Sequence, residues 1–287
     1  MRIERDAIPA YAAGLPLAAP PPGPDPEAHL TGGTREQLAA FWLTLDAINF
    51  GSGWFPTLQK RTGRSGYYTI AAGVRDRFAG TGPWAADQLA RIGPSEISQT
   101  LGQDEHHELM QLFAWSLNDL GRHVTEEHGG RFESVVDSAG DSAEALVELL
   151  AGWECFSDCS RYDGLTVPFL KRAQLAAADL ARARVPSFED LGELTMFADN
   201  LVPHVLRLDG VLKFEPALVE RIEREQAIEH GSPEEVEIRA CAVHAVELIV
   251  AARRGTTAAD VDQLLWLRGQ EPRYKAVPRH RSRCTAY

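Results

Sequence analysis

The sequence predicts a mainly α-helical protein. Segments throughout the chain repeat apolar residues with the 3.6-residue period of a helix, and several of them begin at residues that cap helices. Alternating strand patterns are scarce, and "GLTVPFL" (164–170) is the best candidate for a short strand. The chain has 287 residues, of which 44% are hydrophobic and 24% charged, which is an ordinary globular composition.

The N-terminal part of the chain differs from the rest in composition. The stretch "LAAPPPGPDPEAHLTGGT" (17–34) is linker-like, because its prolines exclude a helix and favour an extended connection. We expect residues 1–34 to form a short segment with a proline-rich linker, packed on the domain that residues 35–287 form.

Helical patterns begin directly after this linker. Residues 35–50 carry an apolar face with helical spacing, and Thr34 precedes them as a plausible N-cap. The residues of this face are Leu38, Phe41, Trp42, Leu45 and Ile48. Residues 105–124, 141–153 and 168–183 show the same periodicity, so each predicts a helix.

The clearest helical signal lies in residues 232–255. Ser232 is a suitable N-cap, Pro233 suits the first helical position, and Glu235 is spaced to close a capping box. Residues 256–269 predict a further helix.

The stretch "TMFADNLVPHVL" (195–206) predicts a buried helix that contains a carboxylate. Its apolar residues have helical spacing, and Asp199 lies among them. A buried carboxylate costs several kcal/mol unless something compensates its charge. Asp199 is therefore a candidate functional residue.

Charge and composition exclude several classes of protein. The net charge of −12 disfavours a long polyanionic partner such as tRNA or DNA, whose binding depends on basic surfaces. No run approaches the roughly 20 apolar residues of a membrane helix, and no secretory leader is recognisable, so we expect a cytoplasmic protein. The four cysteines (Cys155, Cys159, Cys241 and Cys284) are too few for a disulfide framework, and two at close spacing do not make a zinc site.

Common catalytic motifs are missing. "HHELM" (106–110) lacks the second histidine of the zinc-protease motif, and "GSGWF" lacks the remaining glycine of a dinucleotide fingerprint. Neither a phosphate-binding P-loop nor the serine nucleophile elbow occurs in the sequence.

Polar and aromatic residues gather at a few points within the helical segments. In "DAINFGSGWFP" (46–56), Asn49 and Phe50 precede a glycine-rich bend, where they either end a helix or line a pocket. Tyr67 and Tyr68 stand before an apolar run, where they either stack on a ligand or anchor a helix.

Charged residues interrupt two of the apolar helical patterns. Lys171 and Arg172 lie in one of them, and Glu237 and Arg239 lie in the "EVEIRACAVHAVELI" segment. Functional groups and plain ion pairs are both compatible with such positions.

The C-terminal residues concentrate positive charge in an otherwise acidic chain. These residues are Lys275, Arg279, His280, Arg281 and Arg283. They form either a local anion site or a solvated tail.

In order along the chain, these segments resemble the queuosine salvage family, whose members are queuosine 5′-phosphate N-glycosylases (hydrolases). The resemblance rests on "DAINF", "YYTIAAGV", "VPFLKRAQLAAADL", "LTMFADNLVPHVL", "EVEIRACAVHAVELI", "LLW" and a terminal P-x-H-R-x-R-C-x-x-Y. It extends from about residue 42 to Tyr287. One departure is Leu201, which stands near a position where the family commonly has an arginine.

The resemblance implies a fold and an activity. The fold is a single, mainly α-helical domain with the architecture of helical DNA glycosylases. The activity is hydrolysis of queuosine 5′-monophosphate to queuine and ribose 5-phosphate, with no metal or organic cofactor. A mononucleotide also suits the acidic chain better than a nucleic acid does, because one phosphate needs only a local cationic cluster.

The resemblance also implies roles for particular residues. Asp199 is the aspartate of the family's M-F-A-D block and Lys171 the lysine of its K-R-A-Q block, so both are expected to be catalytic. Lys171 is expected either to keep Asp199 ionised or to hold substrate oxygens. A nucleophilic lysine, as in some helical glycosylases, is the alternative, but the expected product, a free sugar phosphate, favours direct hydrolysis. A 7-deaza base has no N7, so the enzyme cannot improve the leaving group by protonating that atom. Catalysis then depends more on stabilising the cationic sugar and activating water, and a carboxylate suits both tasks.

The remaining site residues are expected to bind substrate. For the base these are Asn49, Phe50 and Tyr68, with Glu237 and Arg239 as polar support. For the phosphate they are His280, Arg281 and Arg283, together with Arg172.

Two other functions remain open from the sequence. One is a non-catalytic protein that binds the queuosine nucleotide, and the other is a glycosylase acting on a nucleic acid. We expect no membrane partner, no direct nucleic-acid partner and a monomeric state.

Overall fold

The computed structural model describes residues 1–16 and 23–287, and within them the prediction of a mainly helical protein is confirmed. The helices are α1 (Ile8–Gly14), α2 (Arg35–Ala47), α3 (Gly66–Thr81), α4 (Ala86–Leu89), α5 (Pro94–Leu101), α6 (Glu108–His128), α7 (Phe132–Asp137), α8 (Ala143–Ala151), α9 (Lys171–Arg182), α10 (Leu201–Leu208), α11 (Pro216–Glu223), α12 (Pro233–Ala252), α13 (Ala258–Arg268) and α14 (Pro272–Lys275). The strands are β1 (Arg2–Ile3), β2 (Cys159–Tyr162), β3 (Leu165–Pro168) and β4 (Leu212–Lys213). None of the helices in these described ranges is long and apolar enough to cross a membrane.

Capping residues start several helices where the sequence predicts them. The Thr34 side chain and Gln37 form a complete capping box at the start of α2. The Ser232 hydroxyl accepts the Glu235 N–H at the start of α12, as expected, but the Glu235 carboxylate points elsewhere, toward the Gly231 N–H. The second half of the expected capping box is therefore absent, and this carboxylate serves another contact.

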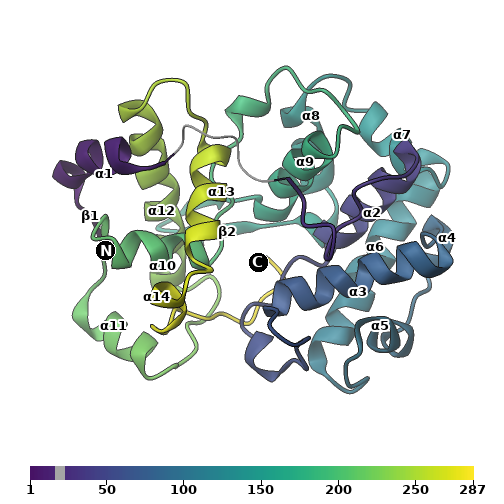
Figure 1. Cartoon of the computed structure of the whole chain (residues 1–287), viewed down its shortest axis with the longest axis horizontal. Coiled ribbons are helices and arrows are strands. Elements are labelled where there is room, and N and C mark those ends of the chain that lie inside the picture. Colours follow the sequence, from purple (N-terminus) through teal and green to yellow (C-terminus); the bar gives the residue numbers. More distant parts are fainter. Residues whose placement is uncertain (17–22) are drawn as a thin grey trace.

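The helices form two groups, each around its own apolar core (Figure 1). The first core is built mainly from the segment α2 to α9, and the second from α1 together with α10 to α14. The N-terminal residues belong to the second group, because β1 pairs antiparallel with β4 and α1 packs against α12. The prediction of a proline-rich extended linker falls in part on residues 17–22, which lie outside the described residues.

The predicted strand at 164–170 forms the second half of a hairpin. Strand β3 pairs antiparallel with β2, with Cys159 opposite Pro168 and Tyr162 opposite Leu165. This hairpin leads directly into α9.

The prediction of a continuous helix over residues 195–206 is wrong for its first half. Helix α10 begins only at Leu201, and residues 195–199 lie in neither a helix nor a strand. Phe197 belongs to the first apolar core, whereas Met196 and Ala198 belong to the second. Successive side chains therefore point to opposite sides, as in an extended strand, because the segment runs between the two cores.

The reading of the cationic C-terminal residues as a solvated tail is also wrong. The segment packs between the two groups of helices and ends near the centre of the molecule (Figure 1). The Gly51 N–H donates to the Tyr287 carbonyl oxygen at 3.0 Å, and the Ile228 N–H donates to the Arg281 carbonyl oxygen at 2.9 Å. Close approach requires Gly53, where an added Cβ would lie 2.4 Å from the Ser282 carbonyl oxygen.

Candidate active site

A cavity of about 680 Å³ is lined by residues from both groups of helices. This volume is suitable for a mononucleotide, because ligand sites usually span roughly 300–1,000 Å³. Aromatic rings form much of its wall, namely Trp42, Phe50, Phe55, Tyr67, Tyr68, Phe197, Trp266 and Tyr287. Polar groups complete the wall, among them Asn49, Ser52, Lys171, Asp179, Asp199, Asn200 and Asp262.

Asp199 lies at the cavity wall directly before α10. One carboxylate oxygen, Oδ1, accepts the backbone N–H groups of Leu201 at 2.8 Å and of Val202 at 3.1 Å. The helix N-terminus and these two hydrogen bonds stabilise its negative charge. The other oxygen, Oδ2, accepts no hydrogen bond from any residue that the structure describes, so it is the oxygen available to a ligand.

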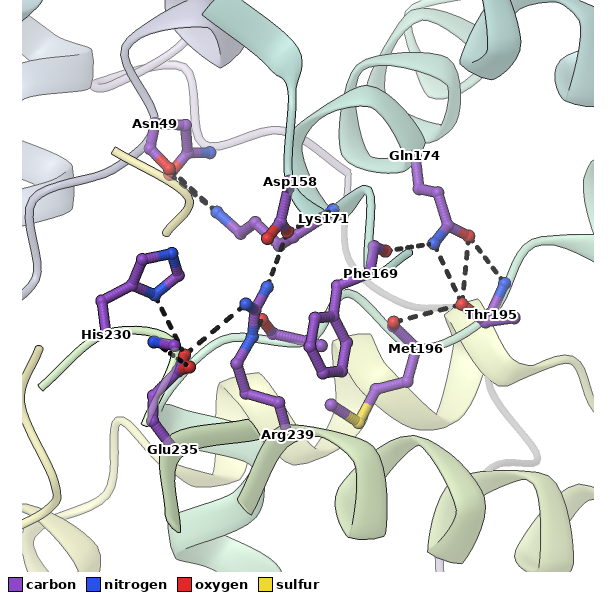
Figure 2. Close-up of polar contacts among 12 residues, drawn as sticks. Asn49, Asp158, Phe169, Lys171, Gln174, Thr195, Met196, His230, Glu235 and Arg239 are labelled. Carbon is purple, nitrogen blue, oxygen red and sulfur yellow. Dashed lines mark hydrogen bonds and ion pairs between the residues drawn. The ribbon is translucent and has the colours of Figure 1, made fainter. Parts of the chain in front are cut away.

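Polar side chains from distant parts of the chain hold the segment that carries Asp199. The Thr195 N–H donates to Gln174 Oε1 at 2.8 Å, and the Phe197 N–H donates to Asp262 Oδ1 at 3.1 Å (Figure 2 shows the contact with Gln174). The Ala198 carbonyl oxygen accepts Arg239 Nε at 2.9 Å. These contacts replace the hydrogen bonds that a helix would have made.

Lys171 is the first residue of α9 and is almost fully buried. Its ammonium Nζ donates to the Asn49 carbonyl oxygen at 2.9 Å and reaches Asn49 Oδ1 at 3.4 Å, and its backbone N–H donates to Asp158 Oδ2 at 3.0 Å (Figure 2). Burial lowers the pKa of Lys171, which the charges of Asp199 and Asp46 oppose. Lys171 and Asp199 line the same cavity without forming an ion pair with each other.

Arg239 connects the two catalytic candidates from behind the cavity. Its Nη2 donates to Asp158 Oδ2 at 2.6 Å, and that oxygen also accepts the Lys171 N–H (Figure 2). Its Nε holds the Ala198 carbonyl oxygen, next to Asp199. The guanidinium is buried and lies 3.9 Å from the centre of the Phe169 ring. One buried cation therefore fixes the backbone at both catalytic candidates.

Other carboxyl groups around the cavity are shifted toward the neutral form. Burial raises the pKa of Asp46, Asp179 and Asp262. The negative charge of Asp179 raises the pKa of Asp46 further, and that of Asp199 raises the pKa of Asp262 further. Asp262 lines the cavity and uses Oδ1 to accept the Phe197 N–H. In its protonated form it has a hydrogen-bond donor to offer a ligand.

Of the residues predicted from the sequence, five line the cavity and six do not. Those that line it are Asn49, Phe50, Tyr68, Lys171 and Asp199. Those outside its wall are Arg172, Glu237, Arg239, His280, Arg281 and Arg283. The structure therefore brings the catalytic and base-binding candidates together, but not the phosphate-binding ones.

The residues outside the wall have structural contacts of their own. The Arg172 guanidinium is buried, donates to the Ala47 carbonyl oxygen at 2.5 Å, and packs over the Phe50 ring. Glu237 accepts the Tyr162 hydroxyl at 2.6 Å on the outer side of α12. Neither contact points into the cavity.

The predicted phosphate-binding residues of the C-terminal segment also face away from the cavity. His280 is buried, Arg281 lies 3.6 Å from Glu225, and Arg283 lies 3.7 Å from Glu108. The His280 carbonyl oxygen instead accepts Asn200 Nδ2 at 3.1 Å, which fixes the residue after Asp199.

Sequence reasoning missed several residues of the site. Asp262 and Trp266 lie on α13 one helical turn apart, so both face the cavity, and that spacing is a signal that could have been read. Asp158, one carboxylate partner of Arg239, carries no local signal, because it lies 81 residues away in sequence. Glu235, the other partner, lies four residues before Arg239 on α12, and that spacing is a second signal that could have been read.

Comparison with known proteins gives consistent matches over most of the chain. A family described as "Queuosine salvage protein" matches residues 29–287. A protein of Sphaerobacter thermophilus named queuosine 5′-phosphate N-glycosylase/hydrolase is 36% identical, over 99% of this chain and 92% of its own length. A protein with the same name from Dictyostelium discoideum is 32% identical, over 86% of this chain and 77% of its own length. Another from Mus musculus is 28% identical, over 88% of this chain and 83% of its own length.

Proposed function

The chain belongs to the queuosine salvage protein family, and we propose that it hydrolyses the N-glycosidic bond of queuosine 5′-phosphate, releasing queuine and ribose 5-phosphate. The observation that carries this proposal is the arrangement at the cavity wall. Asp199, with one carboxylate oxygen unengaged, and the buried Lys171 line the same nucleotide-sized cavity.

Asp199 performs the central chemical role. Cleavage of the bond builds positive charge on the sugar, and a carboxylate in a cavity of low dielectric stabilises that charge. Because Oδ1 is held by two backbone N–H groups, Oδ2 faces the reaction with little freedom to reorient. The same oxygen accepts the proton of the attacking water as the bond to the sugar forms.

Lys171 orients the substrate from the opposite group of helices. Its ammonium is fixed by the Asn49 carbonyl oxygen and side chain, so its remaining hydrogen-bonding capacity is directed to ligand oxygens. Because Asp199 draws its stabilisation from α10, Lys171 does not need to pair with it.

The base occupies the aromatic part of the cavity. Phe50 and Tyr68 belong to the wall there, and the Asn49 amide, which also contacts Asp46 at 3.3 Å, supplies polar contacts to the base edge. Glu237 lies too far out for this role, whereas Arg239 supports it indirectly by holding the segment before Asp199.

We extend the proposal to the protein's fold type, substrate class, cellular location and oligomeric state. Its helical architecture corresponds to that of helical DNA glycosylases, but its substrate is a free nucleotide rather than a nucleic acid. We place it in the cytoplasm as a monomer. The net charge of −12 supports a small substrate over a polyanion.

The test is incubation with queuosine 5′-phosphate, followed by chromatography for free queuine. The Asp199→Asn variant retains an oxygen to cap α10 but loses the charge, so we expect binding to persist and turnover to fall about 10³-fold. Asp87→Asn, at an exposed carboxylate paired with Arg91, is the matched control and leaves turnover unchanged.

Three results would contradict the proposal. Near-normal turnover by Asp199→Asn would remove this carboxylate from the mechanism. If the unmodified protein binds the nucleotide but releases no queuine, it is a binding protein, and release only from a tRNA or DNA substrate would make it a nucleic-acid glycosylase.

A further inference from the structure

The cations that line the cavity differ in whether they already have a partner. They are Lys60, Arg64, Lys171, Arg182, Lys275 and Arg279. Arg64 pairs with Asp25 at 2.9 Å and Arg182 with Asp179 at 2.8 Å, and Lys171 is held by Asn49. Lys60, Lys275 and Arg279 have no side-chain hydrogen bond or ion pair with any residue in the described ranges.

Among these three, Lys60 and Lys275 are exposed, and only Arg279 is partly buried. Its Nε is cut off from solvent and has no hydrogen-bond partner. Burial lowers the pKa of Arg279 and the charge of Asp199 opposes this shift, and both residues line the same cavity. A buried N–H without a hydrogen-bond partner is costly, and an anionic ligand in the cavity would supply the missing acceptor.

The backbone around Arg279 is fixed relative to Asp199. The carbonyl oxygen of Pro278, before it, accepts Arg207 Nη2 at 3.2 Å. The carbonyl oxygen of His280, after it, accepts the side chain of Asn200, the residue next to Asp199. The backbone is therefore anchored on both sides of Arg279, whose side chain lines the same cavity as Asp199.

We propose that Arg279, assisted by Lys275 at the edge of the cavity, binds the 5′-phosphate and makes the enzyme select nucleotides over nucleosides. This inference rests on the proposed function. The phosphate is carried by the same sugar whose glycosidic bond is cleaved, so a cation that lines the same cavity as Asp199 is placed to receive it. The planar guanidinium can bind two phosphate oxygens at once, which Lys275 cannot.

This assignment replaces the one expected from the C-terminal charge pattern. His280, Arg281 and Arg283 do not line the cavity, and both of these arginines lie near surface carboxylates. Only Arg279, of the cluster's arginines, lines the cavity.

The test compares kcat/KM for queuosine 5′-phosphate and for the nucleoside queuosine. We expect Arg279→Gln to lower the value for the nucleotide by about 10- to 100-fold, which is the effect of losing hydrogen bonds to a charged group. The value for the nucleoside should change by less than about threefold. Arg279→Lys should recover part of the loss, and inorganic phosphate should inhibit the variant more weakly than the unmodified enzyme.

Arg273→Gln is the matched control, because Arg273 lies on α14 two residues from Lys275 and does not line the cavity. It should leave the preference for the nucleotide unchanged. Thermal unfolding of each variant separates a folding defect from loss of the phosphate contact, and Lys275→Gln, at an exposed position, gives a second and milder measurement.

Three results would overturn the inference. These are an equal loss with both substrates in folded Arg279→Gln, a nucleotide-selective loss in Arg283→Gln instead, or no preference for the nucleotide in the unmodified enzyme. In each case the enzyme still releases queuine. Failure to release queuine from either substrate would instead refute the proposed function.

Discussion

Replacing Arg239 with methionine should destabilise the protein and lower its activity together. Methionine approximates the length of the arginine side chain but leaves the Asp158 carboxylate buried with a single partner, the Lys171 N–H. It also leaves the Ala198 carbonyl oxygen without its donor. Removing one partner of a buried ion pair costs about 3–5 kcal/mol, because the remaining charge is uncompensated.

This free energy converts into a measurable shift in Tm. At about 2.1 cal/mol/K per residue, the 287 residues give an unfolding entropy of roughly 0.6 kcal/mol/K, so we expect Tm to fall by about 5–8 °C. Turnover of queuosine 5′-phosphate, measured well below that Tm, should fall at least about tenfold, because small displacements of catalytic groups are costly. Such displacement is expected because the segment before Asp199 loses its hydrogen bond to Arg239, and the Asp158 carboxylate that holds the start of α9 loses its own.

A double variant isolates the ion pair from simple loss of packing. In Asp158→Asn/Arg239→Met neither buried charge remains, so its destabilisation should be smaller than the sum of the two single variants by about 2 kcal/mol. Urea unfolding of the four proteins measures this coupling. Additive losses, or an Arg239→Met variant with unchanged Tm, would refute the view that Arg239 organises the site through Asp158.

Two further predictions concern contacts of the C-terminal segment. Contacts with Cys284 and Glu235 raise the pKa of His230 to about 10, so they stabilise the fold fully below pH 6.5 and lose this effect as the pH rises toward 10. The difference in unfolding free energy between the unmodified protein and His230→Gln should therefore shrink from pH 6 to pH 10, and a constant difference would contradict this. Gly53→Ala places a Cβ against the Ser282 backbone, so it should lower Tm and raise KM by displacing the segment that carries Arg279. Gly80→Ala, on α3 with no atom near its Cβ position, should instead be neutral or stabilising by up to about 1 kcal/mol, and equal losses in both variants would remove the steric argument.

Local sequence signals predict the helices well, because helices depend mostly on residues within a few positions. Thr34, Ser232 and Thr257 each cap a helix where the sequence places a Ser or Thr before an apolar periodic run. Residues 195–199 also have an apolar pattern, yet they form no helix. Their backbone partners, on Gln174 and Asp262, lie 21 and 65 residues away in sequence, so no local window contains the cause.

The C-terminal segment shows a signal that the charge pattern concealed. From His280 to Ala286, alternate residues are buried and the arginines between them are not, which is the two-residue period of an extended segment with one covered face. Reading only the cations suggested a solvated tail. Reading the period would have predicted a docked segment, although not that Arg279, just before the alternation begins, lines the cavity.

The catalytic candidates were predictable as residues, but their electrostatic relation was not. Stabilisation of Asp199 by Lys171, one of the two roles expected of the lysine, would have tied the two side chains to each other and left each with less capacity to bind a ligand. In the structure the charge of Asp199 is stabilised by the N-terminus of α10, and the ammonium of Lys171 is held by Asn49. Each group is therefore stabilised by its own neighbours, which allows both to line the cavity unpaired. This separation is what a site needs if the positive sugar of the transition state is to be the counter-charge of Asp199.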